Sequence, residues 1–511
     1  MKTPILGSSY VARSPNAADS RMVNLYPEIL LDGGKDAAFL QRCPGLRLLA
    51  NLGTGPIRGL WVLQSDPSSA LVVSGSTLYR LNRNWSAKTV GYIGGAGPVS
   101  MADNGRQVFI AAGAYGYIFN TVSNTVTQIT SENFQGAGNV AYIDGYFVFN
   151  QPGTQIFRIT GLLEGSTVDG FDIGSAEGSS DVLVGLIADH RELWLFGTNS
   201  VEVWYNSGAL DFPFQRVQGA FNELGCAAAN SIAKLDNSVF WLGADARGRG
   251  MVYRANGYQG QRISTHAVEW QIQQYANLSD AIAFTYQQDG HSFYVLTFPS
   301  ANATWVYDVS TNAWHERASW RNGEFARHRA NCQMSYNGEI VVGDYENGNI
   351  YALDLDAYSD HDQPQRWLRS WRALPTGQND LKRTAHHSLQ LDCESGVGLS
   401  GDDFTDFYGL LLTENNDTLT TENGVAFQVT TAVAQGANPR VMLRWSDDGG
   451  HTWSNEHWAE MGRVGQYGRR VFWRRLGMTL KLRDRVYEIS GTDPVKIAVL
   501  GAELSISPTG A

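Results

Sequence analysis

The sequence has no closely spaced cysteines, no long apolar run and no excess of basic residues, and each absence excludes a class of protein. Its cysteines are Cys43, Cys226, Cys332 and Cys393. They lie far apart without a CxxC pair, which favours reduced thiols over a zinc site or a disulfide framework. The N-terminus lacks the apolar stretch of a signal peptide, and no segment reaches the roughly 18 uninterrupted apolar residues of a membrane helix. We therefore expect a protein made and kept in a soluble compartment.

Charge and motif content exclude further classes. Lys and Arg number 39 against 50 Asp and Glu, so the net charge is −11 and the basic footprint of a nucleic-acid-coating protein is missing. The chain contains no Walker loop, GxSxG elbow, HExxH or dinucleotide fingerprint. His386 and His387 are adjacent, so on a strand they point to opposite faces and do not share a metal. We expect no enzyme: no catalytic residues, no metal site and no cofactor.

Two acidic stretches leave calcium binding open as an alternative. Their oxygen-bearing residues are Asp354, Asp356, Asp360 and Asp362 in the first stretch, and Asp344, Glu346 and Asn349 in the second. Oxygen ligands at alternate positions suit this cation, but neither stretch matches an EF-hand loop. We interpret the first stretch as a surface linker between domains.

Glycine and aromatic residues are abundant, which favours sheets over helices. The 511 residues include 55 Gly, and aromatic residues make up 11% of the chain. Hydrophobic residues are 43% and charged residues 17%, so the chain can bury substantial cores. Its length predicts two to four domains.

A repeated hairpin begins after Pro56. Each copy has an apolar strand, a glycine or polar turn, and a second strand in which an aliphatic residue precedes an aromatic one. The pairs are Leu78-Tyr79, Ile118-Phe119, Ile156-Phe157, Val203-Trp204, Val252-Tyr253, Val306-Tyr307 and Ile350-Tyr351. Their spacing of 38 to 54 residues lies in the range of propeller blades. We predict an all-β fold with a divergent six- or seven-bladed β-propeller over 56–362, and a β-solenoid or a pair of sandwiches is the alternative.

The two flanks of the repeat differ from it. Residues 1–55 show no sustained period, and we expect an extended N-terminal arm that packs on another surface. Beyond the acidic linker, the apolar strands HSLQLDCESGVG, VMLRWSDDGGHTW, VFWRRLGMTLKL and VKIAVLGAELSI return. They predict a C-terminal β-rich, sandwich-like domain over 363–511.

One short motif resembles the Asp-box of sialidases and related propellers. The spacing S-x-D-x-G-x-T-W is met by Ser446, Asp448, Gly450, Thr452 and Trp453. In those families the box is a structural turn whose carboxylate and hydroxyl satisfy turn amides. This chain has one box, outside the repeat, so we interpret it as a structural turn. A carbohydrate-binding or sialidase-like propeller acting on host surface glycans is the alternative function.

One basic run interrupts the acidic chain. Its cations are Arg469, Arg470, Arg474, Arg475, Lys481, Arg483 and Arg485. Strand alternation is imperfect here, so both faces would carry charge. A sheet edge protected by cations is the first interpretation. The functional interpretation is a possible contact with another subunit or with DNA phosphates.

Several short motifs are spread over most of the length. They are SRMVNLYPE at 20–28, RCPG at 42–45, GTNSVEVWY at 197–205 followed by Gly225-Cys226, the stretch from Val441 through SDDG at 446–449 to RVFWRRLG at 470–477, and DPV at 493–495. Through these motifs the chain resembles the packaged-DNA stabilisation proteins of short-tailed bacteriophages, which are also called tail accessory factors or tail hub proteins. No single motif is diagnostic, but their order along the chain carries the match.

The resemblance implies a structural protein of the virion tail that passes through the host cytoplasm during assembly. It implies a homo-oligomeric ring, a hexamer, below the portal and its adaptor proteins. Such a head–tail connector closes the DNA channel and retains the packaged double-stranded genome until ejection. It also carries tail needle, tailspike or fibre proteins and does not insert into a membrane. A receptor-binding adhesin is a third hypothesis.

Overall fold

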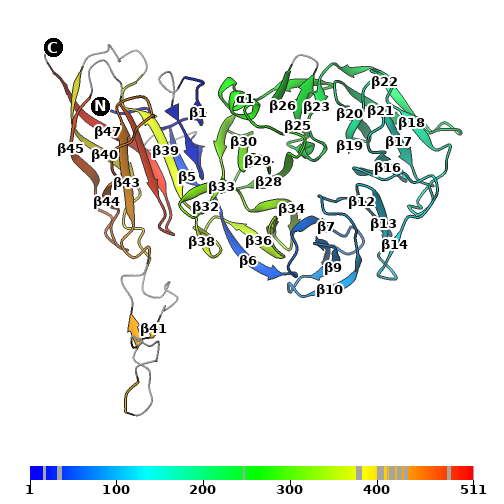
Figure 1. The fold of residues 1–511 in the computed structure, drawn as a ribbon, viewed down its shortest axis with the longest axis horizontal. Coiled ribbons are helices and arrows are strands. Elements are labelled where there is room, and N and C mark those ends of the chain that lie inside the picture. Colours follow the sequence, from blue (N-terminus) through cyan, green and yellow to red (C-terminus); the bar gives the residue numbers. More distant parts are fainter. Residues whose placement is uncertain are drawn as a thin grey trace.

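The computed structural model describes residues 1–14, 19–30, 37–245, 248–375, 383–399, 408–410, 413, 420–422, 428–430, 435–479 and 485–509. These residues form a β-propeller and a β-sandwich that lie side by side (Figure 1). Both labelled chain ends lie at the sandwich. The predicted all-β class, with a propeller followed by a sandwich, is confirmed.

Seven antiparallel sheets of the described chain form the blades of the propeller. Blade 1 consists of β7 (Ile57–Val62), β8 (Ser69–Ser74), β9 (Thr77–Asn82) and β10 (Ala87–Tyr92), and blade 2 of β11 (Ser100–Asp103), β12 (Gln107–Ala112), β13 (Tyr115–Asn120) and β14 (Thr125–Gln128). Blade 3 consists of β15 (Val140–Ile143), β16 (Tyr146–Asn150), β17 (Ile156–Ile159) and β18 (Ile173–Ser175). Blade 4 consists of β19 (Leu183–Asp189), β20 (Glu192–Gly197), β21 (Val201–Asn206) and β22 (Phe214–Asn222).

Blades 5 to 7 complete the ring and differ in how they are assembled. Blade 5 consists of β23 (Gly225–Cys226), β24 (Ala233–Leu235), β25 (Ser238–Asp245), β26 (Gly248–Asn256) and β27 (Gln259–Arg262). Blade 6 consists of β28 (Ile282–Gln288), β29 (His291–Phe298), β30 (Ala303–Asp308) and β31 (Ala313–Glu316). Blade 7 consists of β34 (Ala330–Tyr336), β35 (Glu339–Asp344), β36 (Asn349–Asp354) and β6 (Gly45–Asn51). Blade 7 takes its outer strand, β6, from the N-terminal part of the chain. The propeller is therefore closed by a strand that precedes blade 1.

Each hairpin predicted from the sequence is the second and third strand of one blade, from β8–β9 in blade 1 to β35–β36 in blade 7. The first hairpin of several blades is a two-residue turn in which both residues have positive φ. Examples are Asp144-Gly145, Asp289-Gly290 and Asn337-Gly338. Asn, Asp and Gly tolerate this left-handed region, and its twist matches that of the paired strands. The turn chemistry therefore sets the register of the hairpins.

The hydrophobic cores of the propeller lie between neighbouring blades. Val73 of blade 1 packs with Ile110 of blade 2 in one fully buried cluster, and Phe109 packs with Phe147 of blade 3 in the next. The last cluster joins blade 7 to blade 1, where Val341 packs with Val72. Seven such clusters bury the faces that a single hairpin leaves exposed, which closes the ring.

Two sheets form the sandwich. One consists of β4 (Leu25–Ile29), β5 (Ala38–Arg42), β47 (Ala498–Pro508), β40 (Thr384–Cys393) and β45 (Val471–Met478). The other consists of β3 (Met22–Val23), β39 (Trp367–Arg372), β46 (Val486–Gly491), β43 (Arg440–Ser446) and β44 (His457–Glu460). β3 also pairs with β31, so the second sheet continues into blade 6. The core between the sheets includes Trp367, Trp371 and Tyr487.

The N-terminal segment differs from the expected irregular arm. Its strands β3, β4 and β5 belong to the sandwich, and β6 belongs to blade 7. These strands are two to seven residues long. β4 and β5 pair with each other, and the other partners of these strands come from distant parts of the chain, so no sustained period announces them. We propose 56–362 and 363–511 as the main division of the chain, with strands from residues 1–55 distributed over both parts.

The remaining elements are short. They are β1 (Tyr10–Val11), β2 (Asp19–Ser20), η1 (Ala229–Ser231), α1 (His266–Gln273), β32 (Ala318–Arg321), β33 (Glu324–Arg327), β37 (Ser359–Asp360), β38 (Gln363–Pro364), β41 (Tyr408–Leu410) and β42 (Gln428–Thr430). Thr265 caps α1 by accepting a hydrogen bond from the amide of Val268. In the described part of the chain no helix is long and apolar enough to cross a membrane.

Candidate functional site

The propeller meets the sandwich at a region that we call the joint, defined by Arg21, Asn24, Glu28, Arg42 and Arg317. Arg42 and Arg317 are buried, whereas the side chain of Arg21 is 37% exposed. Arg42, at the end of β5, is 3% exposed. Its guanidinium donates to the side chain of Gln365 and to the carbonyls of Gln365, Asp493 and Val495. Arg317 donates to the carbonyl of Pro44 over 2.7 Å. The RCPG turn is therefore the point at which β5, the linker and blade 6 meet.

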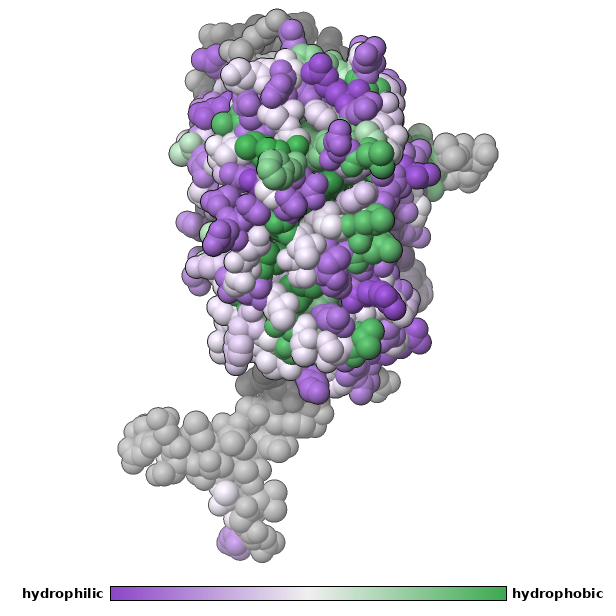
Figure 2. Space-filling model, turned by 90° about the vertical axis from the view of Figure 1, so that its right-hand side faces the viewer, coloured by the Kyte–Doolittle hydropathy of each residue, from purple (hydrophilic) through white to green (hydrophobic). Residues whose placement is uncertain are grey.

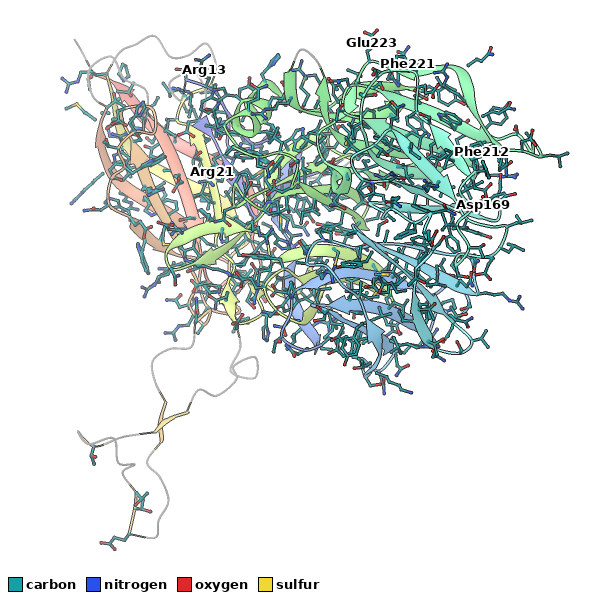
Figure 3. The ribbon with its side chains drawn as sticks, turned by 45° about the vertical axis from the view of Figure 1, so that its right-hand side comes forward. Arg13, Arg21, Asp169, Phe212, Phe221 and Glu223 are labelled. Atoms are coloured by element: carbon teal, nitrogen blue, oxygen red, sulfur yellow. The ribbon has the colours of Figure 1, made fainter. Side chains whose placement is uncertain are left out.

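The motif SRMVNLYPE supplies the other contacts of the joint. Arg21 lies between the sandwich and the propeller (Figure 3) and makes a two-pronged ion pair with Glu316 at 2.8 and 2.9 Å. Asn24 has a left-handed φ of 53° and is fully buried. Its amide donates to the carbonyls of Ala318 and Arg366, and its oxygen accepts from the amide of Ala318. A side chain of another shape would leave these backbone groups unpaired.

His291 links the same motif to blade 6. Its Nδ1 lies 2.7 Å from Asp308 Oδ2 and its Nε2 lies 2.5 Å from Glu28 Oε2. Burial opposes the charged form, but the hydrogen bonds to the two carboxylates win and raise the pKa of His291 to about 9. The imidazolium is therefore charged at neutral pH and joins β4 to β29.

Buried titratable groups around the joint are held in their neutral or paired forms. Burial lowers the pKa of His315 to about 3 and raises that of Cys43 to about 12. Burial also raises the pKa of Asp360 to about 6, although Arg317 opposes this shift. The thiol is therefore inert, and all four cysteines of the chain are free.

The Asp-box residues form a closed local network. Ser446 Oγ donates to Asp448 Oδ1 over 2.6 Å, and Thr452 Oγ1 donates to Asp448 Oδ2 over 2.6 Å. The amides of Gly450 and Thr452 donate to the Ser446 hydroxyl and the Asp448 carboxylate. These hydrogen bonds hold the pKa of Asp448 well below its usual range. Trp453 lies under the Arg444 guanidinium at 4.7 Å, and we propose that the motif acts as a structural turn.

The exposed part of the basic run lies on β45, the edge strand of its sheet. Arg474 and Arg475 are both exposed although they are consecutive. The reason is a bulge: the register with β40 shifts here, and Arg475 has φ 59°. Val471, Trp473 and Leu476 still point into the core. Arg469 and Arg470 precede the strand and are also exposed, and Arg469 pairs with Glu460 at 2.7 Å.

Arg485 does not belong with these exposed cations. Its side chain is 2% exposed and makes a two-pronged ion pair with Asp447 at 2.7 and 2.9 Å. It also donates to the carbonyls of Leu476 and Met478. The role proposed for Arg485 as a subunit or DNA contact is therefore corrected, because the side chain ties the Asp-box loop to β45. Lys481 and Arg483 lie outside the described residues.

Carboxylates of the two acidic stretches form ion pairs with arginines. Asp344 and Asp362 accept from Arg329 at 3.1 and 2.8 Å, and Asp354 accepts from Arg47 at 2.7 Å. Glu346 pairs with Arg321. Within the described ranges no group of three His, Cys, Asp or Glu side chains could hold a metal ion. A cavity of about 390 Å³ beside the joint has four charged residues in its lining, Asp19, Arg21, Glu316 and Arg317, of which Arg21 and Glu316 pair with each other.

Sequence reasoning named the motifs at the joint as marks of a resemblance and missed what they do. The available signal was composition: charged residues stand next to apolar ones in RMVNLYPE and RCPG without the alternation of a half-exposed strand. Such a pattern is typical of charged side chains that are buried with partners.

A family model described as "Bacteriophage P22 Gp10, beta-propeller" matches residues 1–358, and one described as "Bacteriophage P22 Gp10, beta-sandwich" matches residues 404–507. No curated protein matches the chain.

Two solved structures show weak similarity. One is titled "Crystal Structure of Mitotic Checkpoint Complex", with 12% identity and a TM-score of 0.42 over 64% of this chain and 96% of that chain. The other is the computationally designed Ika8 protein, with 12% identity and a TM-score of 0.37 over 61% of this chain and 99% of that chain. These TM-scores are too low to carry an argument.

Proposed function

The chain belongs to the family whose models are described as the bacteriophage P22 Gp10 β-propeller and β-sandwich, and on this basis we propose that it forms the hub ring of a phage tail. The family is one of phage structural proteins, and the chain is a structural component of the virion that stabilises packaged DNA. We further propose that the protein assembles below the portal and its adaptor as a homohexamer. In that place it would close the DNA channel and retain the genome until ejection.

The joint is the observation that carries this proposal. A protein that closes a channel against packaged DNA must transmit force between its parts without bending. Here the two domains share a continuous sheet through β3, and buried arginines cross between them. Charge also supports the role: six copies would carry about −66, six times the −11 of one chain, and such a field repels DNA where it faces a lumen.

The proposed partners follow from the same position. The adaptor and portal would lie on one side of the ring, and a tail needle, tailspike or fibre would attach on the other. Double-stranded DNA would pass through the channel. The alternative of a glycan-active propeller has no support in the described site, because the polar groups of the Asp-box are bonded to each other.

Electron microscopy of negatively stained complexes tests the proposal. The full chain is mixed with the portal–adaptor complex of the same phage, and we expect an additional ring at the adaptor end. The adaptor-free portal is the matched control and should gain no ring. If only unattached monomers are seen with the complete portal–adaptor complex, the proposed function is wrong.

A further inference from the structure

The outer rim of blades 3 and 4 is unusually acidic. Residues 131–224 contain twelve Asp and Glu, three Arg and no Lys. We define the acidic rim by the exposed residues Asp169, Phe171, Glu177, Leu210, Asp211, Phe221 and Glu223. Within the part of the chain that the structure describes, none of its four carboxylates has a cation at salt-bridge distance, whereas Asp144 and Glu202 of the same blades do. The net charge of residues 131–224 is therefore −9, and among the described residues the four carboxylates of the acidic rim have no ion pair that neutralises them.

Large apolar side chains stand among these carboxylates. Phe171 is 92% exposed and Leu210 is fully exposed at 102%. Figure 2 looks onto this side of the molecule and shows apolar patches between polar ones. Isolated exposed apolar residues are ordinary, but several of them within one charged surface mark an interaction site.

The acidic rim spans two blades that pack on each other. The loop before β22 packs on blade 3, because Phe212 contacts Phe157 with ring centres 5.9 Å apart. Gly178, next to Glu177, lies against the ring of Phe221. In Figure 3, Asp169 and Phe212 lie at the right-hand edge of these blades, and Phe221 and Glu223 lie at their upper edge.

The complementary surface lies at the opposite end of the same chain. We define the basic edge by Arg463, Arg469, Arg470, Arg474 and Arg475, with Val464, Tyr467 and Met478. Residues 463–478 contain these five arginines and no Asp or Glu. Tyr467 is 75% exposed. Among the described residues only Arg469 of the five has a recorded salt-bridge partner.

We propose that the basic edge of one copy docks on the acidic rim of a second copy, in a head-to-tail contact. This inference rests on the proposed function, which it deepens by naming the surfaces that join the subunits. Both surfaces combine unpaired charge with exposed apolar groups, as the centre and border of a protein interface do.

Geometry explains why a second copy is the occupant. The sandwich that carries β45 and the blades that carry β18 and β22 lie at opposite ends of the longest axis (Figure 1). One molecule therefore cannot bring its own two surfaces together. A contact between two different surfaces of identical chains repeats from copy to copy, and it makes a closed ring when the rotation closes.

Two charge-reversed variants of the full chain test the contact. R474E/R475E reverses the basic edge, and E177K/D211K reverses the acidic rim. We expect each variant alone to self-associate at least about tenfold more weakly than the wild type, because like charges then face each other. Mixing the two variants should restore association, because every contact in an alternating assembly again joins opposite charges. The measurement is sedimentation velocity in about 50 mM salt, where charge screening is weak.

Two further variants serve as controls. R83E/K88E reverses two exposed cations of blade 1 with no recorded salt bridge and makes the same change in net charge as R474E/R475E. It should associate like the wild type. F171S/L210S leaves the charge unchanged and should weaken association through the apolar part of the acidic rim. Circular dichroism confirms that each variant is folded.

Several results would contradict the proposed contact between the basic edge and the acidic rim. It is wrong if the wild type stays monomeric, if either reversed variant associates normally, or if the mixture fails to associate. Loss of binding to a double-stranded DNA probe by R474E/R475E, with normal self-association, would assign the basic edge to DNA instead. If rings still form on the portal–adaptor complex from R474E/R475E, the contact is wrong while the proposed function stands. If the wild type forms no rings there, the proposed function itself fails.

Discussion

The blades of the propeller and the joint between the two domains are stabilised by different forces. The blades are joined by apolar clusters of residues close in sequence, such as Val73 with Ile110. The joint is made by charged side chains whose partners lie hundreds of residues away, such as Arg21 with Glu316 and Arg42 with Asp493. The apolar residues of a repeated fold can therefore differ from blade to blade, because packing tolerates volume-conserving changes. A buried polar junction tolerates little, because each group must find its partner.

The largest expected effect comes from removing a buried arginine of the joint. Arg42→Met should lower the free energy of unfolding by about 4 kcal/mol, because the carbonyls of Gln365, Asp493 and Val495 lose a donor in a buried site. Chemical denaturation measures this. The matched control is Arg47→Met on β6, whose ion pairs with Glu339 and Asp354 are exposed, and it should cost less than about 1 kcal/mol. Equal costs for the two variants would remove the distinction between the joint and the exposed surface.

The next largest effect is a dependence of the folded state's stability on pH, which arises from His291 beside the joint. The folded state raises the pKa of His291 from 6.5 to about 9. The stabilisation by the charged imidazole is therefore fully present below about pH 6.5 and is lost as the pH rises through 9, by up to about 3 kcal/mol.

Thermal unfolding between pH 6 and 10 follows this loss. His291→Gln should flatten the decline, because it removes the titrating group. His190→Gln, at an exposed position of blade 4, should leave the decline in place. A wild-type melting temperature that does not change between pH 6.5 and 9 would contradict the role of His291 as a charged link.

A smaller effect is expected inside the blades. Ile110→Val removes one methylene from the cluster between blades 1 and 2 and should cost about 1 kcal/mol. The unfolding midpoint in denaturant reports it. A cost equal to that of Arg42→Met would show that blade packing is as demanding as the joint.

The smallest effect on stability concerns the basic edge. R474E/R475E should change the free energy of unfolding by less than about 0.5 kcal/mol, because both side chains are exposed. Assembly into particles should suffer much more than folding. Normal particle assembly by this variant would contradict the interface role.

The repeated hairpins could be predicted because their information is local. An apolar strand, a turn of the Asp289-Gly290 kind and an aliphatic–aromatic pair lie within about fifteen residues, and the period of the copies indicates blades. The pairing of β3 with β31 and β39, of β5 with β47 and of β6 with β36 could not be predicted, since these short segments pair with partners far along the chain.

The all-β class, the seven hairpins and the turn chemistry of the Asp-box follow from the sequence alone, because each depends on residues close along the chain. Tertiary structure was needed to show that blade 7 is completed by β6, that Arg485 is buried against Asp447 while Arg474 and Arg475 are exposed, and that RCPG lies at the joint. The physical reason is that burial and ion pairing of an arginine depend on distant segments. The same residue type serves as a core contact or as a docking surface according to what folds against it.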